Sequence, residues 1–227
     1  EGTGRRAWLG GNIGRPLLDE LGAIRSSDLV VLEPSSFPLV LLPARPEAAA
    51  AHMADPWSRA TGEPGVSMAG AGPGTANLLS GIITAKSEGS PVVAITAGCD
   101  SRAIYPDRGG VFQYADQRRL FEGATKWNAY VSHWKRIPEM VQKAFRIAPR
   151  GQPGPVQLDI PEDVLYADVD ETLVSLASPE HYRATHPLAA DPALVKEAAA
   201  LLTAAELPAI YVGGGVRHSG AWGEVRR

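Results

Sequence analysis

Glu47 is the first residue whose type and position could do chemistry. It follows an apolar run and opens the alanine-rich stretch EAAAAHMADPWSRAT, where a strand would lead into a helix. An acid in the first turn of a helix is favoured by the helix dipole alone, which is an ordinary structural role. A carboxyl group packed among small apolar side chains would instead have its protonation set by its neighbours, as acid–base catalysis requires. The residues alone leave both roles open.

A second candidate site is the glycine-rich segment AGAGPGTANLLSG, which follows an apolar run and precedes a helical stretch. Gly70, Gly72 and Gly74 would let the backbone turn tightly, and Thr75 could cap the helix that follows. The pattern is neither a Walker loop nor a G-x-G-x-x-G fingerprint. This pattern does not decide between two interpretations: a helix N-terminus that faces a ligand, and a tight turn that binds none.

A third stretch, RGGVFQYADQ, places Gln113 in a long loop after a glycine pair. The loop leads into a strand and an amphipathic helix, whose apolar residues recur at helical spacing over 137–148 and form predicted core. His133 and Trp134 close the strand end and are assigned no chemistry. The histidines lack metal-ligand spacing and Cys99 has no visible partner base, so we predict neither a metal site nor a nucleophilic thiol.

The elements that must position these residues alternate between short apolar runs and helical stretches. Most of the runs are apolar on both faces, which is typical of strands buried in a parallel sheet. The predicted strands are 29–33, 39–43, 65–70, 91–98, 155–161 and 208–215, and the predicted helices are 16–21, 47–61, 75–88, 137–148 and 192–205. Strand, helix and strand in repetition predict an α/β fold, a parallel sheet with helices on both faces.

Composition narrows the class of protein. The chain has 227 residues, a formal net charge of −3 and one cysteine, so we expect no nucleic-acid partner and no internal disulfide. The apolar runs are too short to span a membrane, and no basic amphipathic helix favours a membrane surface. The lone cysteine fits a reducing compartment, and we predict a cytoplasmic location. Because the chain opens without a start methionine, we expect it to be the interior of something longer.

Taken together, these stretches resemble one family. RPEAAAAHMADPW, AGAGPGTANLLSG, GVFQYADQ and PGPVQLDIPEDV follow one another within residues 39–163. This order is similar to the pyrimidine-binding domain of thiamine diphosphate-dependent enzymes, above all acetolactate synthase and its decarboxylase and lyase relatives. The resemblance implies thiamine diphosphate as cofactor and a 2-keto acid such as pyruvate as substrate. The family holds magnesium in a diphosphate-binding domain with a Gly-Asp-Gly motif, which is not found in this sequence.

The resemblance gives the candidate residues their roles. Glu47 would hydrogen-bond a ring nitrogen of the aminopyrimidine and favour the imino tautomer, which removes the thiazolium proton. This chemistry needs a carboxyl group in a dry pocket. Pro73 and Asn77 would line the pyrimidine pocket, and Gln113 would face the reacting carbon. Tyr114 stands where the family has an acid, so the resemblance leaves the choice of substrate open.

Two prolines depart from the family pattern. Pro46 replaces the histidine of an Arg-His-Glu motif. Pro56 lies inside the predicted helix, where it removes a hydrogen bond to the carbonyl of His52 and should cost about 3 kcal/mol unless the helix kinks. Both substitutions indicate that the setting of Glu47 has been damaged.

Residues 8–39 resemble a different family, the Mur ligases that add D-glutamate to UDP-N-acetylmuramoyl-alanine, through GGNIGRPLLD and LEPSSFPL. Asn12 and Glu33 would be the active-centre residues carried over, but the sequence has no Walker loop and we do not expect ligase activity. We predict four segments: a Mur ligase-like strand–helix–strand unit at 1–38, a pyrimidine-binding domain at 39–165, a linker at 166–190 and a truncated central α/β domain at 191–227.

The leading hypothesis is a truncated, fused fragment of an acetolactate synthase-like carboligase or decarboxylase that binds the aminopyrimidine of its cofactor. Active sites of this family form between domains of two subunits, so the chain alone should be inactive and should form a homo-oligomer or pair with a diphosphate-binding domain. YVGGGV resembles the start of a flavin site, so a full-length parent could carry FAD. The second hypothesis is a non-catalytic interaction module, and the third is a Mur ligase fragment.

Overall fold

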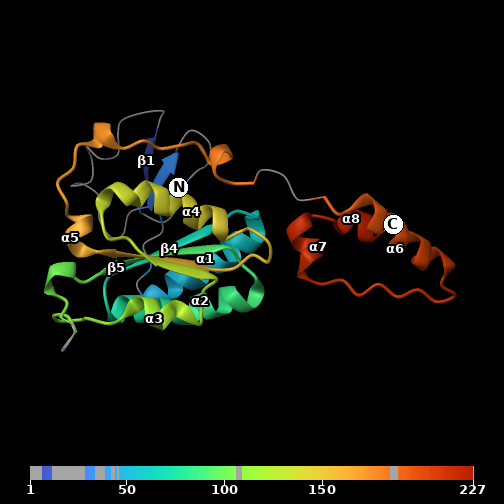
Figure 1. The fold of residues 1–227 in the computed structure, drawn as a ribbon, viewed down its shortest axis with the longest axis horizontal. Coiled ribbons are helices and arrows are strands. Elements are labelled where there is room, and N and C mark those ends of the chain that lie inside the picture. Colours follow the sequence, from blue (N-terminus) through green and yellow to red (C-terminus); the bar gives the residue numbers. More distant parts are fainter. Residues whose placement is uncertain are drawn as a thin grey trace.

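The computed structural model describes residues 7–11, 29–33, 39–41, 44, 46–105, 109–184 and 189–226, and of the first three ranges it describes only the backbone. Its main feature is a parallel four-stranded sheet in the order β4–β5–β7–β6 (Figure 1). The strands are β4 (Gly65–Ala69), β5 (Val92–Gly98), β6 (Trp127–Tyr130) and β7 (Val156–Pro161). The two central strands, β5 and β7, are buried along most of their length, which fits strands covered on both faces.

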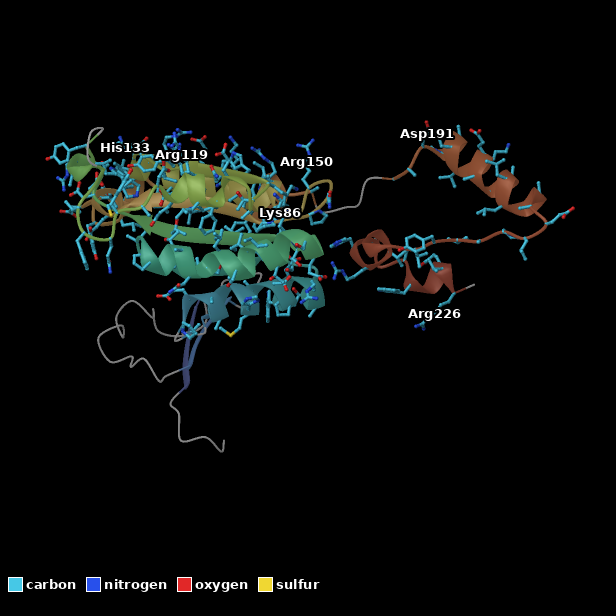
Figure 2. All side chains as sticks on the ribbon, turned by 90° about the horizontal axis from the view of Figure 1, so that it is seen from below. Lys86, Arg119, His133, Arg150, Asp191 and Arg226 are labelled. Atoms are coloured by element: carbon cyan, nitrogen blue, oxygen red, sulfur yellow. The ribbon has the colours of Figure 1, made fainter. Side chains whose placement is uncertain are left out.

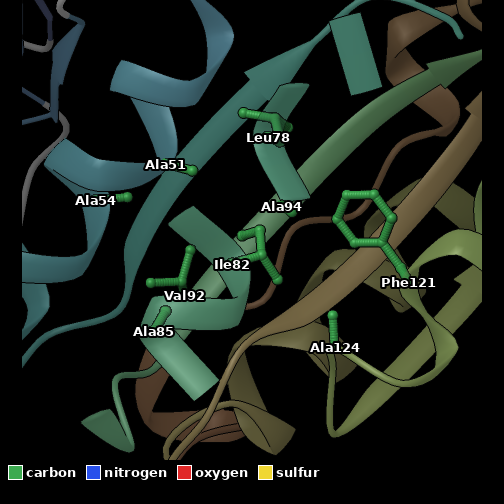
Figure 3. Packing of buried hydrophobic residues seen from close by; sticks show 9 residues of the cluster. All are labelled: Ala51, Ala54, Leu78, Ile82, Ala85, Val92, Ala94, Phe121 and Ala124. Atoms are coloured by element: carbon green, nitrogen blue, oxygen red, sulfur yellow. The ribbon is translucent and has the colours of Figure 1, made fainter. Parts of the chain in front are cut away.

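Helices cover both faces of this sheet, which confirms the predicted α/β class. One face carries α1 (Glu47–Thr61), α2 (Pro73–Glu88) and α3 (Gln117–Glu122), and the other carries α4 (Ile137–Ile147) and α5 (Glu162–Leu165). The first face buries a cluster that includes Leu78, Ile82 and Phe121 (Figure 3). The second face buries a cluster that includes Met140 and Leu158. Two short 3-10 helices complete this part of the chain. η2 (Ser101–Ala103) follows β5, and η3 (Trp134–Arg136) precedes α4.

Helix α1 is continuous despite its two prolines. It ends at Gly62, whose φ of 77° suits a left-handed helix stop. Pro46 precedes the helix, where the missing N–H removes no helical hydrogen bond. Pro56 lies inside the helix but is exposed, as is His52, so water can reach the carbonyl group that Pro56 leaves unbonded. The helix therefore continues through Pro56, over the bounds that the sequence predicts.

Helices α1 and α2 lie against each other at a glycine. A Cβ added to Gly81 would lie 2.5 Å from the Cβ of Ala51 and 2.8 Å from the backbone nitrogen of His52, so only glycine fits there without moving a helix. Both Gly81 and Ala51 are buried. This close approach fixes how the two helices lie along their length, and it brings their first turns side by side.

A separate three-stranded sheet is built from β1 (Ala7–Gly11), β2 (Leu29–Glu33) and β3 (Leu39–Leu41). β1 and β2 are parallel, but β2 and β3 are antiparallel, which corrects the expectation of parallel strands throughout. The five residues between β2 and β3 are too few for the crossover that a parallel pair needs, and this length could have predicted the direction. Asn12 and the helix expected at 16–21 lie outside the described residues.

The C-terminal part holds helices and no strand among its described residues. It comprises α6 (Pro192–Ala204), α7 (Gly214–Ser219) and α8 (Trp222–Val225), and the 3-10 helices η4 (Glu171–Leu173) and η5 (Pro179–His181) precede it. Asp191 caps α6 by accepting a hydrogen bond from the backbone N–H of Ala193 (2.8 Å). The strand expected at 208–215 is wrong: this stretch has no neighbouring strand with which to pair, and it enters α7 instead.

This C-terminal part lies to one side of the four-stranded sheet in both views. Asp191 and Arg226 mark it in Figure 2, apart from Lys86 and Arg119 on the layered part. A hydrogen bond links the two, from the guanidinium group of Arg217 to the backbone carbonyl of Glu88 (2.9 Å). No helix in the described ranges is both long and apolar enough to cross a membrane.

Candidate functional site

The first turns of α1 and α2 bring two of the predicted site residues into contact. The side-chain amide of Asn77 donates a hydrogen bond to Oε2 of Glu47 (3.1 Å). The other carboxylate oxygen, Oε1, lies 3.4 Å from where a Cβ on Gly74 would stand. The carboxyl group of Glu47 therefore lies over the start of α2. An acid and a glycine-rich turn far apart in sequence therefore form one small site.

The setting of Glu47 favours the ionised form of its carboxyl group. Its pKa is lowered, first by a hydrogen bond from its own backbone N–H and then by the bond from Asn77. Glu47 is partly exposed, and Pro73 and Asn77 beside it are exposed. The dry pocket expected around Glu47 is therefore not formed by the described residues of this chain. The physical reason is that Glu47 lies in the first turn of its helix, where the described residues cover it only in part.

The turn before α2 is the second part of the site. Gly72 has φ 58° and ψ −109°, a combination that side-chain-bearing residues avoid, and Pro73 occupies the first helical position. A Cβ on Gly72 would overlap the carbonyl oxygen of Gln113. Gln113 also has a positive φ, 66°. Gln113 therefore lies against the turn, although its side chain is exposed. Thr75 was expected to cap α2, but its hydroxyl donates to the carbonyl of Gly70 instead (2.7 Å).

Sequence reasoning missed Gln117 and Asp159, which support this turn from beneath. Gln117 is 3% exposed, and its Oε1 accepts a hydrogen bond from the backbone N–H of Gly72 (2.7 Å). Its Nε2 donates to Oδ1 of Asp159 on β7 (2.5 Å) and to the carbonyl of Ala97 on β5 (3.1 Å). The signal in the sequence was Asp116, which caps α3 and marks Gln117 as the first residue of a helix.

A cavity of about 320 Å³ lies beside this network, at the carboxyl ends of β5, β6 and β7. Cys99, Tyr114, Tyr130 and Asp159 are among its lining residues. Burial raises the pKa of the Cys99 thiol, and the charges of Glu162 and Asp159 add to the effect, so the thiol stays protonated and is a poor nucleophile. Within the described residues, no group of three or more His, Cys, Asp or Glu side chains could hold a metal ion.

Asp159 is 6% exposed, and burial raises its pKa despite hydrogen bonds from Gln117 and Thr96. The folded state therefore favours the protonated carboxyl group. This contribution to stability is complete below the ordinary Asp pKa of about 3.9 and is lost as the pH rises through the raised value. We expect Asp159→Asn, which cannot ionise, to be more stable than the wild type at neutral pH and to lose that advantage in acid.

Urea unfolding at a series of pH values measures this difference. Exposed Asp168 supplies the control, because Asp168→Asn should follow the wild type at every pH. A free-energy difference between Asp159→Asn and the wild type that stays constant from acid to neutral pH would contradict the expectation.

Comparison with known proteins defines the class to which this fold and site belong. Residues 31–120 match the family described as thiamine pyrophosphate enzyme, N-terminal TPP binding domain. The match spans both parts of the site, since it includes Glu47, the turn at Gly72 and Gln113. Residues 31–120 thus match the N-terminal domain of the thiamine pyrophosphate enzymes, as the resemblance of the motifs predicts.

Within this family, the chain is similar to large subunits of acetolactate synthase. It is 40% identical over 195 residues to the probable acetolactate synthase large subunit of Methanocaldococcus jannaschii, which covers 83% of this chain and 32% of the relative. The corresponding protein of Methanococcus aeolicus is 37% identical over 214 residues (94% and 34%). Acetolactate synthase isozyme 1 large subunit of Escherichia coli is 37% identical over 174 residues (76% and 30%). The chain thus spans about a third of the length of these relatives.

The resemblance of residues 8–39 to Mur ligases is not borne out. The thiamine pyrophosphate family match begins at residue 31, inside β2. The alignment with the Methanococcus aeolicus protein covers 94% of the chain, which leaves too few residues for a separate unit of another family. Of the two residues carried over from that resemblance, Asn12 lies outside the described residues and Glu33 ends β2.

Proposed function

We propose that this chain carries the aminopyrimidine-binding site of a thiamine diphosphate-dependent, acetolactate synthase-like 2-keto acid carboligase or decarboxylase. The observation that carries the proposal is the contact of Glu47 with Asn77 above Gly74. Its support is that these residues lie within the part of the chain that matches the TPP binding domain. Pro73 and Gln113 flank the same turn and complete the proposed set.

The residues present fit the cofactor. Glu47 is only partly buried, and Pro73 and Asn77 beside it are exposed, so a ligand can reach the carboxyl group that Asn77 holds. When bound, thiamine diphosphate supplies the nucleophilic carbon of its thiazolium ring. Glu47 would hold or exchange a proton at a ring nitrogen of the aminopyrimidine, Asn77 would orient the carboxyl group, and Pro73 would line the pocket. Gln113 would face the substrate.

The lowered pKa of Glu47 fits a site that is open on one side. Covering Glu47 with another protein surface would remove water from the carboxyl group, and burial favours its neutral, protonated form. We therefore infer that a diphosphate-binding domain, from a second copy or another chain, closes the site and raises this pKa. That domain would hold the magnesium ion. The proposal also includes pyruvate or another 2-keto acid as the substrate and a cytoplasmic location. It includes FAD as a cofactor of a full-length parent.

Thiamine binding followed by NMR tests the proposal on the chain as it stands. We expect thiamine to shift the backbone amide signal of Gly74 and the side-chain amide signal of Asn77. Glu47→Gln should weaken this binding by about tenfold, the worth of one charge-assisted hydrogen bond. Glu122→Gln, an exposed glutamate on α3, is the matched control and should bind like the wild type. Equal affinity for both variants would refute the assignment of Glu47.

Turnover provides a second readout. With a diphosphate-binding domain added in trans, Glu47→Gln should release carbon dioxide from pyruvate about 10²–10⁴ times more slowly than the wild type, as expected for a lost acid–base group. The chain alone, given thiamine diphosphate and magnesium, should release none. Release by the chain alone would overturn the proposal that a second domain completes the site.

A non-catalytic interaction module is the second candidate function, and exposed apolar side chains favour it. Met53 and Trp57 on α1 are 39% and 47% exposed, and Met68 on β4 and Ile83 on α2 are 58% and 50% exposed. Apolar surface of this kind often marks a contact with another protein. One variant, Glu47→Gln, distinguishes the two functions. If the chain is a packing module, the variant keeps its association with its partner. If the chain is a catalytic partner, the variant loses the activity.

A further inference from the structure

Gln117 connects the glycine turn to the centre of the sheet. Both polar atoms of its amide are engaged: Oε1 by the N–H of Gly72, and Nε2 by Asp159 and by the carbonyl of Ala97. At 3% exposure it exchanges none of these bonds readily with water. A buried amide satisfied in this way has one orientation, because a flip of the amide would place donor against donor at Gly72.

The far end of the connection is rigid. Asp159 lies on central strand β7, and its Oδ1 is 3.2 Å from the hydroxyl of Thr96 on β5. That hydroxyl accepts a further hydrogen bond from the side-chain amide of Gln157 (3.0 Å). All three residues of this anchor are buried. The position of the Gln117 amide is therefore set by the two central strands of the sheet.

The near end is a backbone conformation that needs support. Gly72 has a positive φ and passes against the carbonyl oxygen of Gln113. The residues that follow it, Gly74 and Asn77, form the floor of the site and hold Glu47. A turn that relaxed at Gly72 would move the start of α2 and the Gln113 loop together.

We propose that Gln117 is a positioning residue for the cofactor site: by holding the N–H of Gly72, it fixes the first turn of α2 against Glu47 and the loop of Gln113. It touches neither cofactor nor substrate. The inference rests on the proposed function for its role in binding, but the contact of Asn77 with Glu47 can be followed without any cofactor. A residue with a purely structural role would change the stability of the fold and leave that contact unchanged.

The decisive variant is Gln117→Met, which keeps the length of the side chain and removes its hydrogen bonds. We expect hydrogen exchange of the Gly72 amide to be about tenfold faster, the loss of one hydrogen bond, while the Val93 amide in β5 is unchanged. The side-chain amide signal of Asn77 should move toward its position in Glu47→Gln. Thiamine affinity should fall by about tenfold. Gln142→Met, at a half-buried glutamine on α4, is the control and should change none of these.

Gln117→Glu distinguishes positioning from packing. Glutamate keeps an acceptor for Gly72, but it can donate to Asp159 only when protonated. The Asn77 signal and thiamine affinity, each compared with the wild type at the same pH, should therefore recover as the pH falls, which Gln117→Met cannot do. An unchanged Asn77 signal in Gln117→Met, or no recovery in Gln117→Glu, would overturn the inference. Absence of thiamine binding by the wild type would instead refute the proposed function, and the Asn77 signal would still decide the role of Gln117.

Discussion

Replacing Gly72 with alanine will destabilise the chain by about 3 kcal/mol and remove its response to thiamine. Two costs add: the backbone of residue 72 has φ 58° and ψ −109°, and the new methyl group would overlap the carbonyl oxygen of Gln113. Strained backbone and overpacking each cost about 1–3 kcal/mol. Because the turn cannot keep both its conformation and its contact with Gln113, the site should be lost with the stability. Urea unfolding and the thiamine titration measure the two effects.

Gly62→Ala separates the two costs. Gly62 also has a positive φ, 77°, but no atom lies within 4 Å of where its Cβ would be. The variant should therefore show only the backbone cost, about 1 kcal/mol, and should bind thiamine like the wild type. If the two alanine variants were equally stable, the collision with Gln113 would not exist in solution.

Phe121→Ala should cost about 3–5 kcal/mol, the range for removing a buried phenylalanine. Its side chain is fully buried in the cluster with Leu78 and Ile82, where it joins α3 to α2 (Figure 3). Loosening α3 also frees Gln117, the first residue of the same helix, so we expect the Gly72 amide to exchange faster as well. The measurements are urea unfolding and hydrogen exchange.

The adjacent residue provides the control. Leu120 is 41% exposed on the same short helix, and Leu120→Ala should cost less than about 1 kcal/mol because little apolar surface is lost from the core. A comparable loss of stability in both variants would show that α3 contributes through its helical backbone and not through the burial of Phe121.

Local sequence signals predicted the elements that are long or strongly marked. α1 was predicted at its observed bounds, because an alanine-rich run ends at a glycine that can adopt a positive φ. The central strands were predicted to within a residue, since buried parallel strands are apolar without interruption. α3 was missed because a helix of 6 residues is too short to show periodicity. The strand expected at 208–215 failed because a strand exists only with a neighbour, which no local pattern supplies.

The candidate site likewise contains residues that the sequence predicted and residues that it did not. Glu47 and Asn77 were predicted together because their motifs follow one another in a family order, and the structure places them in contact. Gln117 and Asp159 were missed because their bond joins residues 42 positions apart, and nothing local distinguishes a buried amide from an exposed one. The dry pocket was expected from the apolar residues of α1, but exclusion of water depends on what covers the open end of that helix.

The glycine at the crossing of α1 and α2 sets a condition for the contact between Glu47 and Asn77. The acid and the amide stand four residues before Ala51 and Gly81 respectively, so the helix separation at that crossing decides whether they can touch. A homologue that conserves both polar residues but has a bulkier side chain at either crossing position would hold its helices apart. A search for homologues that keep this contact should therefore score all four positions together and not the glutamate alone.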